Sequence, residues 1–410
     1  MTKELLEKYA ELAVKVGINI QPGQILRINT PIEAADLARL CQTWAYRLGA
    51  KKVIISFRDE LVNKIDLELA SQEALCEFPA YKTSEMNYLI DNNAALLSIY
   101  AETPGLLKDI DAAKLQAVAI ANSTNLKPLQ EYSMSGAGQW SLVSYPTGGW
   151  AKKVFPDCSE SEAIDKLWEN ILLTARVDKE GDAIANWATH NQEMAKHNDI
   201  LNSYNLDYLV FKNELGTDLK VHLAENHRWA GGSEKALNGI VFNPNIPTEE
   251  CFSMPYKTKV DGKVVATKPL NYQGKLIEDF WLVFQDGKVV DYDAAKEKEA
   301  LKSLLEFDEG SSYLGEVALI SHDSPISQTG ILFFNTLFDE NASCHLALGC
   351  AYPMNIIDAE SKSEEELFAL GFNKSLVHED FMFGSREMCI TGYDKSGREI
   401  EIFKRGNFVF

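Results

Sequence analysis

The first 150 residues alternate between stretches in which apolar side chains recur every three or four positions and short, continuous apolar runs. The first pattern is typical of amphipathic helices and the second of buried strands. At 30–33 the letters TPIE predict a helix start with Pro31 in the first helical position. Strands are expected at 25–28, 53–55, 94–101 and 140–145. The alternation predicts an α/β layered N-terminal domain with a largely parallel sheet over residues 1–150.

After residue 150 the pattern changes to helices and then to closely spaced β-rich runs. A helical connector is expected over 151–205. Because Asp-Gly or Gly between β-rich runs is a strong turn signal, we expect a series of hairpins after it. Their turns are predicted at Gly216, Asp261-Gly262 and Asp286-Gly287. We therefore predict an α+β C-terminal domain over 151–410, connector included, that is rich in antiparallel strands.

The net charge of the chain limits the kinds of molecule that it is expected to bind. The chain has 410 residues and a formal net charge of −20, from 60 acidic and 40 basic residues. Such a charge repels phosphate backbones and anionic lipid surfaces, so nucleic acid and membrane are not expected partners. The opening MTKELLEKYAE lacks the apolar core of a signal peptide, and no run approaches a membrane span. We expect a cytoplasmic protein.

The seven cysteines are scattered and never spaced C-x-x-C, so neither a disulfide framework nor a cysteine-rich zinc site is indicated. Histidine and carboxylate pairs are more informative. The letters HEDFM at 378–382 begin like the zinc-protease motif H-E-x-x-H, but Met382 occupies the last position. If this stretch is extended, His378 and Asp380 lie on one face of a strand.

Further polar residues interrupt apolar segments. His345 lies in LFDENASCHLALGCAY and Glu316 in YLGEVALI, where we expect it on the same strand face as Leu314. A buried carboxylate without a cation or a proton costs several kcal/mol. Glu249 and Glu250 follow the turn NIPT, which could aim one of the two inward.

Together these residues supply oxygen and nitrogen ligands in a mixture that suits zinc, cobalt or manganese. The candidate ligands are Glu250, Glu316, His345, His378 and Asp380. With one bridging carboxylate and a bridging water they provide about eight bonds, which is enough for two four-coordinate ions. The predicted arrangement is that of a two-metal hydrolase, in which a hydroxide activated by two divalent ions is the nucleophile.

Four separate patches carry a resemblance to a known family: NPNIPTEECF (243–252), LGEVAL (314–319), LFDENASCHLALGCAY (337–352) and LVHEDFMFGS (376–385). In these patches, and over essentially its whole length, the chain resembles the aminopeptidase T, aminopeptidase S and PepS family of metallopeptidases. The resemblance implies a homodimeric, cytoplasmic enzyme that removes N-terminal residues from peptides with a free N-terminus. It also implies that the five candidate ligands hold two metal ions, with Glu250 preferred to Glu249, and that Tyr352 is catalytic.

Other roles in this chemistry have weaker candidates. An aminopeptidase must bind the substrate's ammonium group, for which Asp339 or Glu340 could serve. A general base is also needed, and Glu249 is a candidate because it adjoins Glu250. The alternatives are a metal-independent glycosidase that uses Glu250 and Glu316, and a non-enzymatic peptide-binding protein with a structural metal.

Overall fold

The computed structural model describes all residues from Met1 to Phe410. The chain divides into two compact units, Met1–Asn191 with Ser233–Pro247, and Gln192–Gly232 with Thr248–Phe410. The limits of these units differ from those of the predicted domains, 1–150 and 151–410. The predicted domains stay a prediction about which parts of the chain fold independently. None of the helices is long and apolar enough to cross a membrane.

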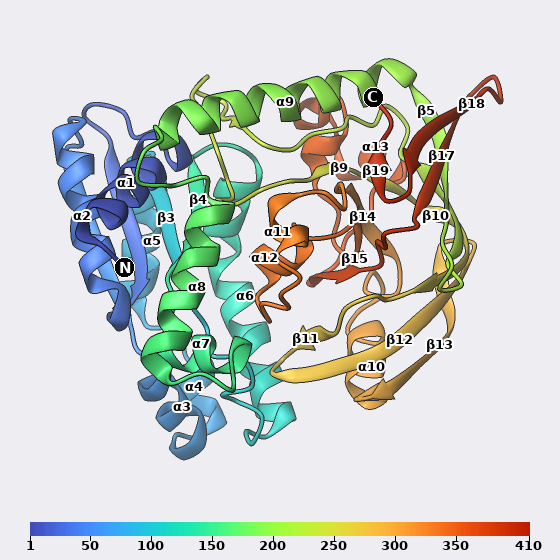
Figure 1. Ribbon diagram of the computed structural model, residues 1–410. Coiled ribbons are helices and arrows are strands. Elements are labelled where there is room, and N and C mark those ends of the chain that lie inside the picture. Colours follow the sequence, from blue (N-terminus) through green and yellow to red (C-terminus); the bar gives the residue numbers. More distant parts are fainter. The chain divides into compact units, whose positions relative to one another are not determined.

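The first unit contains a four-stranded sheet of order β2-β1-β3-β4 in which every pair is parallel (Figure 1). Its strands are β1 (Ile25–Pro31), β2 (Lys52–Arg58), β3 (Ala95–Tyr100) and β4 (Trp140–Ser144). A two-stranded ribbon of β7 (Glu234–Lys235) and β8 (Val241–Phe242) also belongs to this unit. The predicted α/β class with a parallel sheet is confirmed.

Helices connect these strands, as parallel pairing requires. The connecting helices are α2 (Ala35–Arg47), α3 (Glu60–Leu69), α4 (Gln72–Cys76), α5 (Ala80–Asp91) and α6 (Ala112–Met134). Helix α1 (Lys3–Leu12) precedes β1, and α7 (Gly148–Val154) and α8 (Glu160–Thr174) follow β4. The helix start predicted at Pro31 is wrong, because β1 continues to Pro31 and a 3-10 turn at Ile32–Ala34 precedes α2. The residues of α9 (Ala183–Tyr204) are shared between the two units.

The second unit contains a nine-stranded antiparallel sheet of order β11-β12-β10-β6-β5-β17-β18-β19, with β13 paired to β12. Its strands are β5 (Leu206–Lys212), β6 (Asp218–Leu223), β10 (Pro255–Val265), β11 (Leu270–Tyr272), β12 (Lys275–Gln285), β13 (Lys288–Lys296), β17 (Cys389–Asp394), β18 (Glu399–Lys404) and β19 (Asn407–Phe408). The predicted antiparallel character of the C-terminal part is confirmed, as are the hairpins at Gly216 and Asp286-Gly287.

The hairpin predicted at Asp261-Gly262 is wrong, because both residues lie inside β10. Gly262 has a φ of +116°, and a Cβ atom there would lie 2.2 Å from the carbonyl oxygen of Asp218 on β6. The glycine therefore permits β10 and β6 to approach closely. Glycine inside a strand often marks such a close approach of two backbones.

A separate four-stranded antiparallel sheet has the order β16-β15-β14-β9. Its strands are β9 (Cys251–Ser253), β14 (Leu314–Leu319), β15 (His345–Gly349) and β16 (His378–Met382). One face belongs to the main hydrophobic core of the unit, where Val317, Leu346 and Phe381 are buried. The short helices of this unit are α10 (Lys298–Leu305), α11 (Pro325–Gln328), α12 (Thr336–Glu340) and α13 (Glu364–Ala369).

Candidate metal centre

The face of this small sheet that is turned away from the main core carries the predicted ligands. Glu316 and Asp380 both pair with Ala347, so that the two carboxylates flank one residue of the central strand β15. His345 begins β15, and His378 begins β16 two positions before Asp380. Residues directly opposite one another on neighbouring strands point to the same side, as do alternate residues of one strand.

A bulge in β14 sets the direction of Glu316. The register shifts between Leu314, which pairs with Leu348, and Glu316, which pairs with Ala347. The extra residue is Gly315, where a Cβ atom would lie 2.4 Å from the carbonyl oxygen of Cys350. The expectation that Leu314 shares a face with Glu316 is therefore wrong: Leu314 lies in the main core, while Glu316 points to the opposite side.

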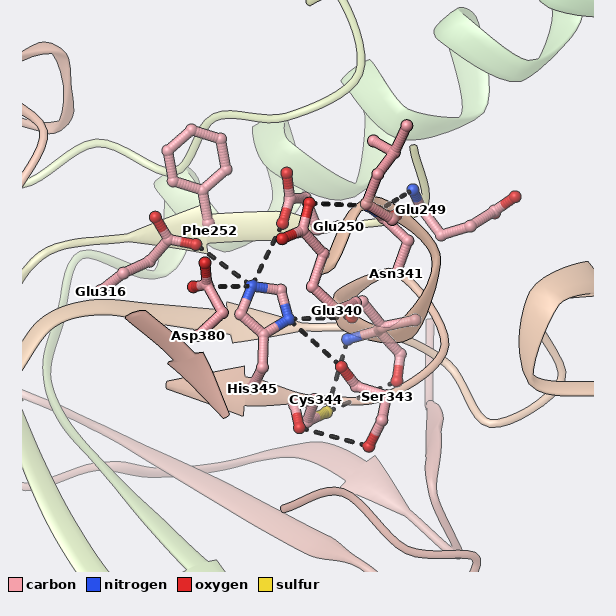
Figure 2. Close-up of polar contacts among 12 residues, drawn as sticks. Glu249, Glu250, Phe252, Glu316, Glu340, Asn341, Ser343, Cys344, His345 and Asp380 are labelled. Atoms are coloured by element: carbon pink, nitrogen blue, oxygen red, sulfur yellow. Dashed lines mark hydrogen bonds and ion pairs between the residues drawn. The ribbon is translucent and has the colours of Figure 1, made fainter. Parts of the chain in front are cut away.

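Glu250 reaches the same place from a different part of the chain, immediately before β9. The Nε2 atom of His345 lies 3.3 Å from a carboxylate oxygen of Glu250, 3.3 Å from one of Glu316 and 3.9 Å from Oδ1 of Asp380 (Figure 2). The Nε2 atom of His378 lies 3.7 Å from Glu316 and 3.5 Å from Asp380. The structure thus brings all five predicted side chains together.

Backbone carbonyl groups orient both imidazole rings. His345 donates from Nδ1 to the carbonyl oxygen of Glu340 at 2.9 Å, and His378 donates from Nδ1 to that of Cys350 at 2.6 Å. Because a carbonyl can only accept, each Nδ1 carries a proton and each Nε2 faces the carboxylates. Metal-binding histidines usually have this arrangement, in which the second nitrogen is fixed by an acceptor.

The donor set fits a cation. Ligand atoms of Glu250, Glu316 and His345 all lie within 4.8 Å of one another, and these residues are 8%, 5% and 1% exposed. The Oδ1 atom of Asp380 is buried and accepts no hydrogen bond. Three carboxylates in so small a volume repel one another unless positive charge lies between them. Carboxylate oxygens and imidazole nitrogens are suitable ligands for divalent transition metals.

The electrostatics of the cluster agree with this need for positive charge. Burial raises the pKa of Glu316, and the nearby charges of Glu250 and Asp380 raise it further against the hydrogen bond from His345. Burial lowers the pKa of His345, but its contacts with Glu250 and Glu316 outweigh burial and hold this pKa well above the ordinary value.

The weaker candidates separate clearly in space. Glu340, at the end of α12, is only partly accessible to solvent. The partial burial of its carboxyl group, followed by the nearby charges of Asp380 and Glu250, raises the pKa of Glu340 well above the ordinary value. Asp339 instead accepts hydrogen bonds from the backbone of Phe333 and Asn335 at 2.9 and 3.0 Å. Glu340 therefore belongs to the charged cluster, whereas Asp339 holds the loop before α12.

Glu249 does not share the direction of Glu250. Figure 2 shows its side chain directed away from His345. Its backbone N–H donates to the side chain of Asn341 at 2.7 Å, and Asn341 in turn donates to the carbonyl oxygen of Leu337 at 2.9 Å. The sequence analysis did not single out Asn341. The one feature of the sequence that could have indicated it is its position directly after Asp339 and Glu340. It ties the segment that carries Glu250 to α12.

Tyr352 borders the cluster. Its ring centroid lies 4.7 Å from that of His378 and 6.1 Å from that of Phe252. Burial, followed by the charges of Glu316 and Asp380, raises the pKa of Tyr352 well above the ordinary value. The phenol therefore keeps its proton and can donate a hydrogen bond.

Comparisons with known proteins define the class. The family model described as "Thermophilic metalloprotease (M29)" matches residues 2–408. Aminopeptidase 2 of Geobacillus stearothermophilus is 48% identical over 408 residues, which cover 99% of this chain and 98% of that protein. Aminopeptidase AmpS of Bacillus subtilis is 44% identical over 405 residues, with the same coverage.

A solved structure agrees with these sequences. The structure of wild-type AmpT from Thermus thermophilus has a TM-score of 0.92 and 38% identity, and the match covers 100% of both chains. The chain therefore belongs to the M29 family of metallopeptidases. The predicted family is confirmed, and with it the class of metal-dependent aminopeptidase; the glycosidase and the binding protein are not favoured.

Proposed function

We propose that this protein removes N-terminal residues from peptides at a centre of two divalent metal ions held by five side chains. These are Glu250, Glu316, His345, His378 and Asp380. The observation that carries the proposal is the pair of imidazoles whose Nε2 atoms face three carboxylates while their Nδ1 atoms are fixed by backbone carbonyls. Divalent ions bound there would lower the pKa of a water molecule and polarise the peptide carbonyl.

The protein groups around the centre have separate tasks. Tyr352 donates from its hydroxyl group to the oxyanion that develops on the peptide carbonyl oxygen; its raised pKa and its contact with His378 support this role. Glu316 and Asp380 lie close to the Nε2 atoms of both imidazoles, so that carboxylates and imidazoles together would hold the ions. The backbone carbonyl of Glu340 keeps the ring of His345 in one tautomer.

Charge balance suggests the task of the Glu340 side chain. Three carboxylates and one hydroxide would neutralise two divalent ions, so the carboxylate of Glu340 is in excess. A peptide with a free N-terminus brings one positive charge. We assign Glu340 to the substrate's ammonium group, because it is partly accessible and lies close to Asp380 and Glu250. Glu249 stays a weakly supported candidate for the general base, because its side chain is directed away from His345.

The remaining parts of the proposal concern the setting of the enzyme. The metal is zinc, cobalt or manganese, in keeping with the mixed oxygen and nitrogen ligands. The protein is cytoplasmic and homodimeric, as the family resemblance implies, and its acidic composition suits a soluble enzyme that does not bind nucleic acid.

Metal removal tests the function directly. After treatment with a chelator the protein should no longer hydrolyse peptides that have a free N-terminus, and zinc or cobalt should restore hydrolysis. Acetylation of the substrate's amino group should prevent cleavage even with metal present. Hydrolysis that survives complete metal removal would contradict a metal-dependent mechanism, and efficient cutting of acetylated peptides would contradict an aminopeptidase.

A further inference from the structure

A row of five side chains crosses the small sheet and connects the candidate metal centre to an apolar surface. Ala230 pairs with Phe252, Phe252 with Ala318, Ala318 with His345, and His345 with Met382. Directly opposed residues of an antiparallel sheet point to the same side, with Cβ atoms about 5 Å apart. Phe252 and Ala230 therefore lie on the same face as His345, two and three strands away from it.

This apolar surface is a distinct cluster, separate from the main core. Its buried members are Phe252, Ala318 and Ile320, and the partly exposed side chains packed against them are Ala230, Tyr352 and Met354. Tyr352 links the cluster to the centre, because its ring contacts both Phe252 and His378. We call this cluster the apolar wall.

The apolar wall is held rigidly. The side chain of Asn355, which is 1% exposed, donates to the carbonyl oxygens of Arg228 and Phe252, both at 3.2 Å. Arg228 donates from its backbone N–H to the carbonyl oxygen of Asn355 at 2.7 Å and from its guanidinium to that of Met354 at 2.6 Å. The segment that carries Met354 is therefore fixed against the segment that carries Arg228 and Ala230.

In an aminopeptidase substrate, the first side chain branches from the carbon next to the carbonyl that is attacked. When that carbonyl lies at the metal centre, this side chain must lie within a few bond lengths of it. We propose that Met354 and Phe252, which pack in one cluster with Tyr352 beside the centre, receive the side chain of the substrate's first residue, so that the enzyme prefers peptides that begin with a large apolar residue such as leucine. This inference rests on the proposed function.

Apolar contact at such a surface discriminates by roughly tenfold or more for each methylene group. The metal-loaded wild type should therefore cleave leucine p-nitroanilide with a higher kcat/KM than alanine p-nitroanilide. Met354→Ala should reduce this ratio by about tenfold. Met354→Glu should raise the ratio of lysine to leucine p-nitroanilide by at least about tenfold, because a carboxylate would then meet the first side chain.

The Glu variant is decisive, because a general loss of structure lowers kcat/KM for the lysine and leucine substrates alike and leaves their ratio unchanged. Ile400→Ala is the matched control, since Ile400 is also a partly buried apolar residue but packs on the main core. It should leave both ratios within twofold of the wild type. Bound metal and thermal unfolding are measured for every variant.

The outcomes separate the inference from the function on which it rests. If the wild type hydrolyses these substrates but neither Met354 variant changes its ratios by more than twofold, the inference is overturned and the aminopeptidase stands. An equal loss on all substrates with metal retained also overturns it. If the metal-loaded wild type hydrolyses no substrate with a free N-terminus, the proposed function itself is wrong.

Discussion

The sheet formed by β9, β14, β15 and β16 has two very different faces. On one face, Val317 and Leu346 pack into the main core. On the other face, Glu316 of β14 lies close to His345 of the neighbouring strand β15. All four are buried, with exposures of 0% for the two apolar residues, 5% for Glu316 and 1% for His345. Burying charge without a compensating cation costs several kcal/mol, so folding alone would favour apolar residues on both faces. The difference supports the proposal that the charged face binds a cation.

The adjacent residues His345 and Leu346 allow the sharpest test of this comparison, because they point to opposite faces of β15. His345→Ala should reduce peptide hydrolysis by at least about a thousandfold, since it removes the proposed ligand that lies closest to the carboxylates of Glu250 and Glu316. Bound metal, measured by plasma mass spectrometry, should fall below two ions per chain while circular dichroism stays unchanged. Full metal content in this variant would remove His345 from the ligand set.

Tyr352 tests whether the charged face also contains a separate hydrogen-bond donor. Tyr352→Phe keeps the ring contacts with His378 and Phe252 but removes the hydroxyl group. Loss of one donor to a developing oxyanion typically lowers kcat by about a hundredfold to a thousandfold. Stopped-flow or steady-state kinetics should show this fall with metal content unchanged. A kcat within threefold of the wild type would exclude Tyr352 from catalysis.

Glu340 should have a smaller effect that appears in KM. A hydrogen bond to a charged group contributes about 1.5–3 kcal/mol, so Glu340→Gln should raise KM for peptides with a free N-terminus by about ten- to a hundredfold. Glu379→Gln is the matched control, because Glu379 adjoins Asp380 on β16 and points to the other face. Loss of one metal ion from Glu340→Gln would make Glu340 a ligand instead.

The smallest effect on activity is expected on the apolar face. Leu346→Ala should lower the free energy of unfolding by about 2–5 kcal/mol, because Leu346 is fully buried in the main core. At temperatures where the variant remains folded, its metal content and kcat should match the wild type within twofold. Urea denaturation and metal analysis check both statements. Loss of metal from this variant would contradict the independence of the two faces.

Local periodicity in the sequence predicted much of this arrangement. On the condition that 378–382 is extended, alternation places His378 and Asp380 on one face, and β16 fulfils this condition. The parallel sheet of the first unit likewise follows from alternating apolar runs. Sequence cannot reveal how a glycine is used, however. Gly262 and Gly315 permit close backbone contacts with distant residues. For this reason the turn predicted at Asp261-Gly262 is wrong, and so is the expectation that Leu314 and Glu316 share a face.

Contacts between distant segments were also beyond local rules. Glu249 and Glu250 are chemically identical neighbours, and only the hydrogen bond from the backbone of Glu249 to Asn341 shows how the segment is anchored. The same holds for Asp339 and Glu340, whose different roles depend on the loop at 333–335 and on the carboxylates of other strands. Candidate residue types were visible in the sequence, whereas their directions required the fold.

Anomalous diffraction from crystals grown with excess zinc tests the central claim most directly. Data collected at the zinc absorption edge should give two peaks in each chain. Each of the five side chains Glu250, Glu316, His345, His378 and Asp380 should have a ligand atom about 2.0–2.2 Å from at least one of the two peaks. Peaks elsewhere on the chain, with these five side chains bound to no ion, would contradict the claim that they form the metal centre of the enzyme.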